Sequence, residues 1–329
     1  SIPSRIGFLD SNTDGLTDRL YVGDLGGQVW RVDISESVPL TGTRSTGTVV
    51  GLLAKVSDGS TENRRRFFEK PSIVQVNDTT FSTSEEYDYV LIGSGNRSHP
   101  LEESVKDKFY AFRDRFISNN ALVDSNGDGV SGDNDGYPTP THKPYSHSDQ
   151  NSLLNVTTKG VATQAASDPG KVKASDGWFF DFAEANSGRP GEKALSSPLT
   201  AGGAAIFTTF DPKAESGANA QASSSGNTTS AQAKKNDPCS AAPNIGTARA
   251  YHINILTAEP PEITEVNGNN NENNRFREII GSGIPSDVIP VFTQEGVIGI
   301  AQSDGRGIGL GQLSSTTPER AYWNESIEF

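Results

Sequence analysis

The sequence predicts an all-β protein, and more closely a modified β-propeller, complete or partial, with long loop insertions. The first observation is composition: 34 glycines and 18 prolines among 329 residues, with 33% hydrophobic residues, favour many turns and short strands over long helices. The second is a series of short apolar segments that end in glycine or polar residues. The third is a repeated unit, in which an apolar strand, a turn and an aromatic-bearing strand ending in Asp or Asn follow one another. Such recurrence is typical of propeller blades.

The first repeat unit spans residues 19–33 and reads as two short strands. Leu20 and Val22 alternate on the first strand, and Val29 and Val32 lie on the second. Between them stand Gly26 and Gly27, and a Gly-Gly pair is a strong signal for a two-residue hairpin turn. We therefore expect a β-hairpin here, directly after a polar loop.

Two further units follow, separated by insertions of different length. Residues 89–95 with 107–114 form the second unit, and residues 205–210 with 248–254 form the third. The strand at 89–95 is continuously apolar, which suits burial on both faces. Because each blade packs against the next, we expect the aromatic residue of each unit to anchor a packed layer and not to bind a ligand. The residues at matching places are Trp30, Tyr110 and Tyr251.

The whole chain, 1–329, is assigned to one propeller region. Low-complexity insertions are expected at about 212–236 and 264–275, because these stretches hold almost no large apolar residue. The basic run Arg64–Arg66 is expected to lie on a solvated edge. Further strands are predicted at 49–56, 67–75, 288–293 and 297–301, and a glycine-rich turn at 305–311.

Alternating oxygen-bearing residues near the amino end carry the main functional hypothesis. The ligand order is that of an EF-hand-type calcium loop, because Ca²⁺ takes six to eight hard oxygen ligands and a tight loop offers alternate side chains to its interior. Gly15 stands at the sixth position, where the loop must turn sharply, and Tyr21 replaces the usual twelfth-position Glu. The alternative is a polar Asx-type turn that caps a strand. The candidate ligands are Asp10, Asn12, Asp14, Leu16 through its carbonyl, and Asp18.

A second candidate loop has the same order and is more complete, because an Asp occupies its twelfth position. Asp is shorter than Glu, so we expect looser closure and lower affinity for Ca²⁺ at this loop. The alternative is an acidic turn without a metal. Its candidate ligands are Asp124, Asn126, Asp128, Val130 through its carbonyl, and Asp135.

At the first loop the chain resembles a known family. The loop Asp-x-Asn-x-Asp-Gly-x-x-Asp runs straight into Arg-Leu-Tyr-x-Gly-Asp-x-x-Gly-x-x-Trp-Arg-x-Asp, over residues 10–33. This is similar to the C-terminal propeller domain of the PilY/PilC type IV pilus biogenesis proteins and tip-associated adhesins. Residues 92–114 and 177–212 are also similar to segments of these proteins. The resemblance implies a modified β-propeller and a calcium site that governs pilus extension and retraction.

Charge and motifs exclude several classes of function. The net charge of −13 argues against nucleic acid or an anionic membrane as a partner. No run of about 18 apolar residues predicts a membrane span. The single cysteine, Cys239, gives no disulfide framework, and the four histidines are not spaced for zinc. Neither a Gly-x-Ser-x-Gly motif nor a Walker loop occurs. Met is absent and the chain starts at Ser1, so either a leader was removed or the chain is a fragment.

The leading hypothesis is a calcium-binding assembly protein that is not an enzyme. By the resemblance, it is a pilus assembly factor or tip adhesin whose partners are minor pilins or the type IV pilus machinery, with a host or abiotic surface as a further target. The same resemblance predicts a place at the pilus tip or cell surface, the outer membrane or the periplasm. One alternative is a quinoprotein-like propeller dehydrogenase, which the lack of vicinal cysteines disfavours. Another is a calcium-stabilised extracellular scaffold with no link to pili.

Overall fold

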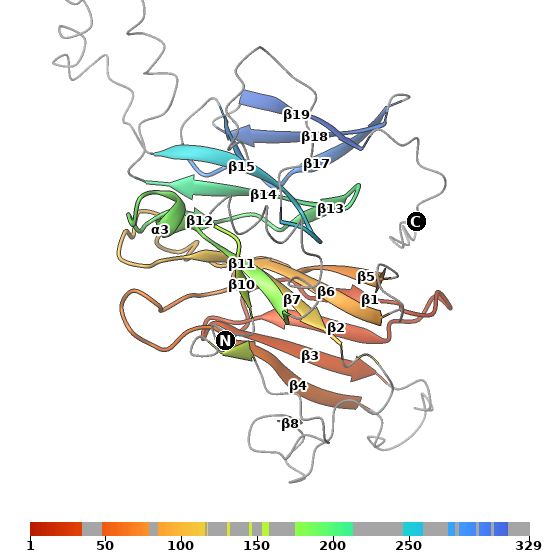
Figure 1. The fold of residues 1–329 in the computed structure, drawn as a ribbon. Helices are drawn as coiled ribbons and strands as arrows, with labels where there is room; N and C mark the ends of the chain where they lie inside the picture. The colour runs from red at the N-terminus through yellow and green to blue at the C-terminus, as the bar shows by residue number, and fades with distance from the viewer. Residues whose placement is uncertain are drawn as a thin grey trace, which may run out of the picture.

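The structure, a computed structural model, is nearly all β, and its described part contains one short helix (Figure 1). None of the helices in that part is long and apolar enough to cross a membrane. Both predicted low-complexity insertions, apart from residue 212, and Cys239 lie outside the described residues. The structure describes residues 1–34, 48–78, 85–115, 117, 130–131, 145–146, 153–157, 175–212, 246–258, 276–279, 283–293, 296–303 and 306–314.

Sheet A contains the first repeat unit as the antiparallel pair β2–β3. The loop between these strands, residues 24–27, has four residues and not two. It is closed by Asp24, whose Oδ1 accepts hydrogen bonds from the N–H groups of Gly26 (2.8 Å) and Gln28 (2.9 Å). The strand order is β1-β2-β3-β4-β8, with β9 also paired to β4. The strands are β1 (Gly7–Leu9), β2 (Arg19–Gly23), β3 (Gln28–Ile34), β4 (Thr48–Lys55), β8 (Val130–Ser131) and β9 (Tyr145–Ser146).

Sheet B contains the second repeat unit as the antiparallel pair β6–β7. Its order is β10-β11-β7-β6-β5, so β5 and β10 are its edges. The predicted strand at 67–75 begins only at Ser72, because Phe67 is instead buried in the core next to sheet A. The strands are β5 (Ser72–Asp78), β6 (Glu85–Gly93), β7 (Lys108–Asp114), β10 (Leu154–Asn155) and β11 (Gly177–Asp181).

Sheet C contains the third repeat unit as the antiparallel pair β14–β15. The helix α3 (Phe182–Ala185) directly follows β11 and is capped by Asp181, whose carboxylate accepts hydrogen bonds from the N–H groups of Ala183 and Glu184. The order of sheet C is β12-β14-β15-β16, with β13 also paired to β14. The strands are β12 (Lys193–Ala194), β13 (Leu199–Ala201), β14 (Ala204–Asp211), β15 (Thr247–Asn254) and β16 (Phe276–Ile279).

Sheet D is a three-stranded meander of β17 (Ile289–Thr293), β18 (Gly296–Ser303) and β19 (Arg306–Ser314). The first two strands confirm the predictions for 288–293 and 297–301. The prediction of a glycine-rich turn at 305–311 is wrong, because Arg306–Ser314 pairs with β18 as an edge strand. The pairing is interrupted by register shifts, which is the irregularity that glycines permit within a strand.

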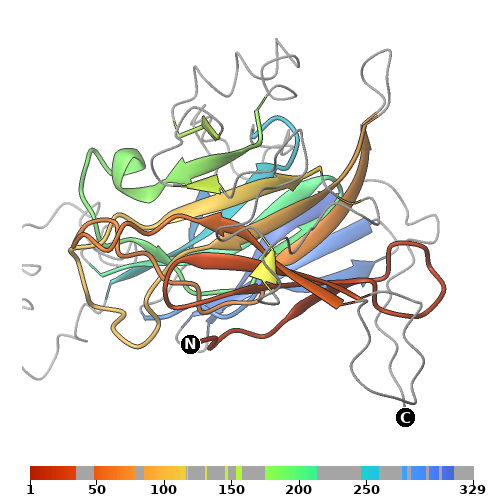
Figure 2. The ribbon, with the colours of Figure 1, turned by 90° about the horizontal axis from the view of Figure 1, so that it is seen from below.

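The four sheets lie one above the other in chain order, from sheet A at the bottom of Figure 1 to sheet D at the top. Seen from below in Figure 2, strands of successive sheets cross at an angle. Each of the first three sheets has a repeat unit as its antiparallel centre, which confirms the predicted blades. The fold is β-propeller-like, and its described part holds four sheets.

Sheet B is buried on both faces, as the apolar run in β6 predicts. Because side chains alternate along a strand, Tyr89 and Leu91 pack toward sheet C, whereas Val90 and Ile92 pack toward sheet A. Strand β14 repeats this arrangement, with Phe207 in the core next to sheet B and Ile206 in the core next to sheet D. The alternation therefore joins consecutive sheets through continuous apolar layers.

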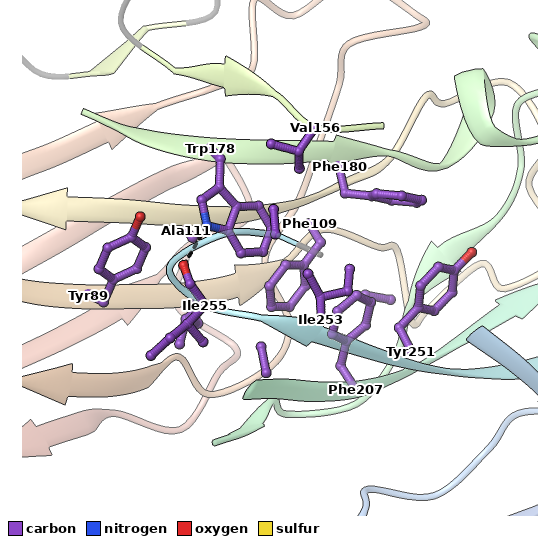
Figure 3. Packing of buried hydrophobic residues seen from close by; sticks show 14 of the residues in the cluster. Tyr89, Phe109, Ala111, Val156, Trp178, Phe180, Phe207, Tyr251, Ile253 and Ile255 are labelled. Carbon is purple, nitrogen blue, oxygen red and sulfur yellow. Dashed lines mark hydrogen bonds between the residues drawn. The ribbon is translucent and has the colours of Figure 1, made fainter. Parts of the chain in front are cut away.

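The layer between sheets B and C is built from stacked aromatic rings (Figure 3). Phe109 of β7 stacks on Phe207 of β14 with ring centroids 3.8 Å apart, and Phe207 stacks on Tyr251 of β15 at 5.1 Å. Trp178 of β11 donates a hydrogen bond from its Nε1 to the carbonyl of Ile255, at 2.8 Å. Buried aromatic pairs add to the stability that their buried area already gives.

The three aromatic residues at matching places of the repeat do face the same way, but only two are buried. Tyr110 packs in the core toward sheet A, and Tyr251 packs in the core toward sheet B. Trp30 is only half-buried, with its Nε1 donating to Asp24 at 3.3 Å, so the expectation that it anchors a packed layer is wrong. Each aromatic residue faces the preceding sheet, and among the described residues no sheet precedes sheet A.

Two glycines allow sheets B and C to approach closely. A Cβ on Gly93 would lie 2.3 Å from the Cβ of Ala194, and one on Gly95 would lie 2.3 Å from the carbonyl oxygen of Ala194. Any larger residue at either position would push β12 away from the end of β6. The glycines that end the apolar strand in the sequence are thus required by packing.

Beside this close approach lies a buried polar cluster that also joins sheets B and C. Lys193 of β12 donates from its ammonium to the carbonyls of Pro100, Glu102 and Gly191. Asp107 accepts a hydrogen bond from Ser94 Oγ at 2.8 Å through Oδ1, while its Oδ2 has no hydrogen-bond partner. Burial raises the pKa of Asp107 to about 6, against the lowering effect of the Ser94 hydrogen bond.

The stacked rings predict a large effect of truncating Phe207. We expect Phe207→Ala to lower the free energy of unfolding by about 3–5 kcal/mol, because it leaves a cavity between two sheets. Leu101→Ala, at a side chain that is 64% exposed, serves as the control and is expected to change it by less than about 0.5 kcal/mol. Urea unfolding measures both. Equal effects of the two substitutions would contradict the packing described here.

The raised pKa of Asp107 predicts a specific pH dependence. Between about pH 4 and 6 the folded protein holds this proton more tightly than the unfolded chain does, so the contribution of Asp107 to the free energy of unfolding falls as pH rises. The full change approaches about 3 kcal/mol for a shift of about two pKa units. Unfolding free energies of the wild type and Asp107→Asn are compared at pH 4 and 7.5, where their difference should change by an amount of this order. A difference that is constant with pH would refute it.

Candidate calcium-binding loop and the network behind it

The first candidate loop, residues 10–18, joins β1 to β2 and extends from the side of the sheet stack (red in Figures 1 and 2). Its two ends are held together, because Asp18 donates its N–H to the carbonyl of Leu9 at 2.9 Å. The carbonyl of Asp18 in turn accepts from the N–H of Ile34 at 2.7 Å. Strands β1, β2 and β3 therefore fix the base of the loop.

Inside the loop, three of the predicted ligand side chains bend back onto the loop's own backbone. Asp10 accepts hydrogen bonds from the N–H groups of Asp14 (3.2 Å) and Gly15 (2.8 Å). Asn12 Oδ1 accepts from the N–H of Asp14 at 3.0 Å, and Asp14 Oδ1 accepts from the N–H of Leu16 at 2.7 Å. The side-chain oxygens of the first, third and fifth positions therefore face backbone N–H groups of the loop itself.

The sixth and seventh positions also behave as the calcium-loop pattern requires. Gly15 has φ +90°, a conformation that glycine adopts without strain, so the sharp turn predicted at this position is confirmed. The Leu16 side chain is 63% exposed. No contact within the loop uses that side chain, which agrees with a role for Leu16 through its carbonyl alone.

The ninth position is placed differently from the other ligands. Asp18 Oδ2 accepts hydrogen bonds from the N–H and the hydroxyl of Ser11, at 2.6 and 2.5 Å. In the part of the chain that the structure describes, no three His, Cys, Asp or Glu side chains are grouped so that they could hold a metal. The carboxylates of Asp10, Asp14 and Asp18 are therefore bound within the loop and do not converge on one point.

The donor set and the course of the backbone fit a hard cation, while the carboxylates would have to turn inward to hold one. Four side chains with oxygen atoms, together with the Leu16 carbonyl, lie on a loop of nine residues, in the spacing that calcium loops use. The hydrogen bonds that now occupy these oxygens are short-range and solvent-exposed, so reorienting the carboxylates requires little change elsewhere.

Most of the second candidate loop lies outside the described residues. Of its ligands, Asp124, Asn126, Asp128 and Asp135 are not described, and only the backbone of Val130 is placed. Val130 lies in β8 and pairs in parallel with Val50 of β4, at the outer edge of sheet A. Its role as a ligand stays a prediction.

Behind the first loop, the residue that follows it enters a buried charged network between sheets A and B. Arg19 donates from Nε to Asp88 of β6 at 2.7 Å, and from a terminal nitrogen to the carbonyl of Ile117 at 3.2 Å. The hydroxyl of Tyr21, which is fully buried, is a donor to the carboxylates of Asp88 and Asp114 and lies 2.9 Å from an oxygen of each. Asp18, the last residue of the loop, and Arg19, a member of the network, are thus adjacent in the chain.

The network continues along the next strand. Arg31 of β3 pairs with Asp114 of β7 at 2.9 Å and with Asp33 at 2.7 Å. Burial raises the pKa of Asp88, and the charge of Arg19 opposes that rise. Because two carboxylates and two guanidinium groups are buried together, each charge depends on its partner.

The sequence reading missed this network, although a signal for it exists. Each second strand of the repeat carries an Arg or a terminal Asp, such as Arg31 and Asp114, which we read as polar strand ends. Arg65 was also misassigned: it is 1% exposed and not on a solvated edge. It donates to the carbonyls of Lys106 and Val56 and so ties two segments of the chain together.

Fold and loop together define an all-β, propeller-like domain with a candidate cation loop on its first blade, and comparisons with known proteins agree. No family model matches the chain. The Type IV pilus biogenesis factor PilY1 homolog of Xylella fastidiosa is 24% identical over 202 residues, which are 61% of this chain and 14% of that protein. The chain therefore spans a small part of this curated relative.

The solved structure of the Pseudomonas aeruginosa PilY1 C-terminal domain superimposes with a TM-score of 0.52 at 14% identity. The superposition covers 92% of this chain and 59% of the solved one. The resemblance to the PilY/PilC proteins is thus confirmed, and the fold is that of the PilY1 C-terminal domain.

Removing one charge from the buried network should strongly destabilise the protein. Asp88→Asn leaves Arg19 without its counter-charge, and we expect a loss of about 3–5 kcal/mol in the free energy of unfolding. Glu62→Gln, in an ion pair with Lys106 whose side chains are 61% and 36% exposed, is the control, with an expected loss below about 1 kcal/mol. Denaturant unfolding at neutral pH compares them, and a loss at Asp88 as small as that at Glu62 would argue against the network's role.

Proposed function

We propose that this chain is a non-enzymatic type IV pilus biogenesis factor in which Ca²⁺ at residues 10–18 controls the conformation of the first blade. The observation that carries the proposal is the winding of the loop. Asp10, Asn12 and Asp14 accept hydrogen bonds from N–H groups of the loop itself, and Gly15 has positive φ where the chain turns, which supports the proposal. The fold shared with the PilY1 C-terminal domain and the relative named as a pilus biogenesis factor support the pilus role.

The path from the loop to the body of the protein is short. Binding of Ca²⁺ would draw Asp18 away from Ser11 and toward the ion, and Arg19 follows it directly in the chain. Arg19 is fixed by Asp88 in sheet B, so tightening of the loop acts on the junction of sheets A and B. Without the cation, carboxylates gathered in one loop repel each other, and the loop loosens.

For the finer role we propose a calcium-gated contact with minor pilins or other parts of the pilus machinery, so that calcium occupancy regulates extension and retraction. Adhesion to a host or abiotic surface, and a place at the pilus tip, cell surface, outer membrane or periplasm, belong to the same proposal. The support for these points is the similarity to the PilY1 proteins. Co-purification with minor pilins separates this role from that of a calcium-stabilised scaffold.

The competing dehydrogenase hypothesis has a direct test. Purified protein is mixed with a quinone cofactor and Ca²⁺, and dye-linked alcohol oxidation is measured. Turnover of an alcohol would overturn the proposal of a non-enzymatic factor, whereas an unchanged absorbance spectrum and no oxidation support it.

Calcium titration tests the loop itself. We expect the wild type to release heat on binding Ca²⁺ with a dissociation constant on the order of 10⁻⁴–10⁻³ M, the range of extracellular modules. Asp14→Ala should abolish the heat that belongs to the first loop, and Asp128→Ala should abolish any heat that belongs to the second. Isothermal titration calorimetry of the three proteins gives the number of ions and their loops.

The matched control is Asp58→Ala, which removes an aspartate from an exposed turn where its carboxylate accepts from the N–H of Ser60. It should leave calcium binding unchanged. If Asp14→Ala binds as many ions as the wild type, or if the wild type binds none at millimolar Ca²⁺, residues 10–18 are an Asx-type turn and the proposed gating falls.

A further inference from the structure

A pocket of about 460 Å³ lies between the segment before β1, the segments that precede β5 and follow β6, and the start of β17. Strand β5 contacts both β1 and β13, and Asp287, just before β17, links sheet D to the rest. Its carboxylate accepts from the N–H of Ser197 at 2.9 Å and from Arg5 at 3.4 Å. Segments next to sheets A, B and D therefore line this pocket, and the contact of Asp287 with Ser197 ties it to the segment before β13 of sheet C.

The pocket is lined by three cationic and two acidic side chains. The acidic side chains are engaged: Asp287 as above, and Glu69, which is 8% exposed, through a 2.7 Å contact between its Oε1 and Arg97. Burial raises the pKa of Glu69, and the Arg97 hydrogen bond opposes the rise. The carboxylates thus complete internal contacts and offer little to a ligand.

The cationic side chains, by contrast, have N–H groups that make no hydrogen bond within the part of the chain that the structure describes. Arg97 uses one nitrogen, Nη1, for both Glu69 and the carbonyl of Leu195 (2.8 Å), and its side chain is half-exposed. Within the described residues, its Nη2 and Nε have no hydrogen-bond partner. Lys70 has no carboxylate at ion-pair distance in that part of the chain, and its ammonium lies 5.2 Å from the ring centroid of Phe8. Arg5 holds Asp287 only at 3.4 Å and is 73% exposed.

Apolar surface accompanies these donors. Pro3, Phe68 and Ile289 also line the pocket, and Ile289 is 59% exposed. On a chain with a net charge of −13, a hollow with unused guanidinium and ammonium donors beside apolar side chains selects a ligand that carries both an anionic and an apolar group. The volume fits a few amino-acid residues.

We propose that this pocket binds a peptide carboxylate flanked by an apolar side chain, with Lys70 and Arg97 as the residues that hold the carboxylate. The carboxylate comes from an acidic side chain or from the end of a chain, since both present the same two oxygens. The guanidinium of Arg97 offers paired donors to them, and Lys70 supplies the charge that no described carboxylate balances. The pocket would then be a docking point for a protein segment, separate from the calcium loop.

The test is calorimetric titration with the peptide acetyl-Phe-Glu-Ala-amide and its counterpart in which Gln replaces Glu. We expect the Glu peptide to bind the wild type and the Gln peptide to bind at least about tenfold more weakly, because a hydrogen-bonded charge is lost. Lys70→Met should weaken binding of the Glu peptide by a similar factor. Lys55→Met, the same change at an exposed lysine of β4, should leave it unchanged. Thermal unfolding confirms that both variants are folded.

Three results would overturn the proposal: no binding of the Glu peptide at millimolar concentration, equal binding of the two peptides, or equal binding to Lys70→Met and the wild type. Inorganic phosphate is titrated as a competitor. Displacement of the peptide by phosphate at equal concentration would mark a general oxyanion site and overturn the assignment to a peptide. The peptide titration is repeated with a chelator that removes Ca²⁺. Peptide binding should be unchanged, because the proposed pocket is separate from the calcium loop and does not rest on the proposed function.

Discussion

The buried pairing of Arg19 with Asp88 and of Arg31 with Asp114 is the interaction on which the first half of the structure depends. A charge removed from water is tolerated only when a partner of opposite sign and good geometry is present. Four such groups from two sheets satisfy one another, with the Tyr21 hydroxyl between the two carboxylates. Sheets A and B can therefore pack in one relative position, and the loop that precedes Arg19 is held against that position.

The other pairs of adjacent sheets are held together by different interactions. Between sheets B and C, stacked rings and a close approach at glycine residues dominate. The ammonium of Lys193 also donates to three backbone carbonyls there. Between sheets C and D the core is smaller, with Ile206, Ala248 and Ala301 among its buried members. The junction of sheets A and B thus combines a charged network with an apolar cluster, whereas the apolar cluster between sheets C and D is smaller.

Much of the fold could be predicted from the sequence because the residue pattern of a strand depends on neighbours in the chain. Alternation in β2, the apolar run of β6 and the recurrence of aromatic strands depend on neighbouring residues, so they were read correctly. Strand β19 was missed because glycine lowers strand propensity, and only pairing with β18 reveals it. Trp30 was expected to be buried, because the sequence cannot say whether another sheet precedes the first.

The candidate site likewise has a part that the sequence could predict and a part that it could not. The hydrogen bonds of residues 10–18 are local Asx turns and Gly15 has positive φ, so this part of the site depends on neighbouring residues that the sequence shows directly, while binding of Ca²⁺ there stays a prediction. The charged network and the cationic pocket also depend on residues far apart in the chain, such as Arg19 with Asp88, 69 positions apart, and Arg5 with Asp287, 282 positions apart. Contacts of that range leave no periodic trace in one sequence.

The contact between Arg5 and Asp287 has a consequence for the order of events during biosynthesis. Because its two residues are 282 positions apart, this contact cannot form before residue 287 has been synthesised. The first three sheets consist of strands that end before residue 280, so they can assemble earlier, and the tie between the segments that precede β1 and β17 comes late. A growing chain therefore carries Arg5 without this partner until the start of sheet D is made, which places the contact among the last steps of folding.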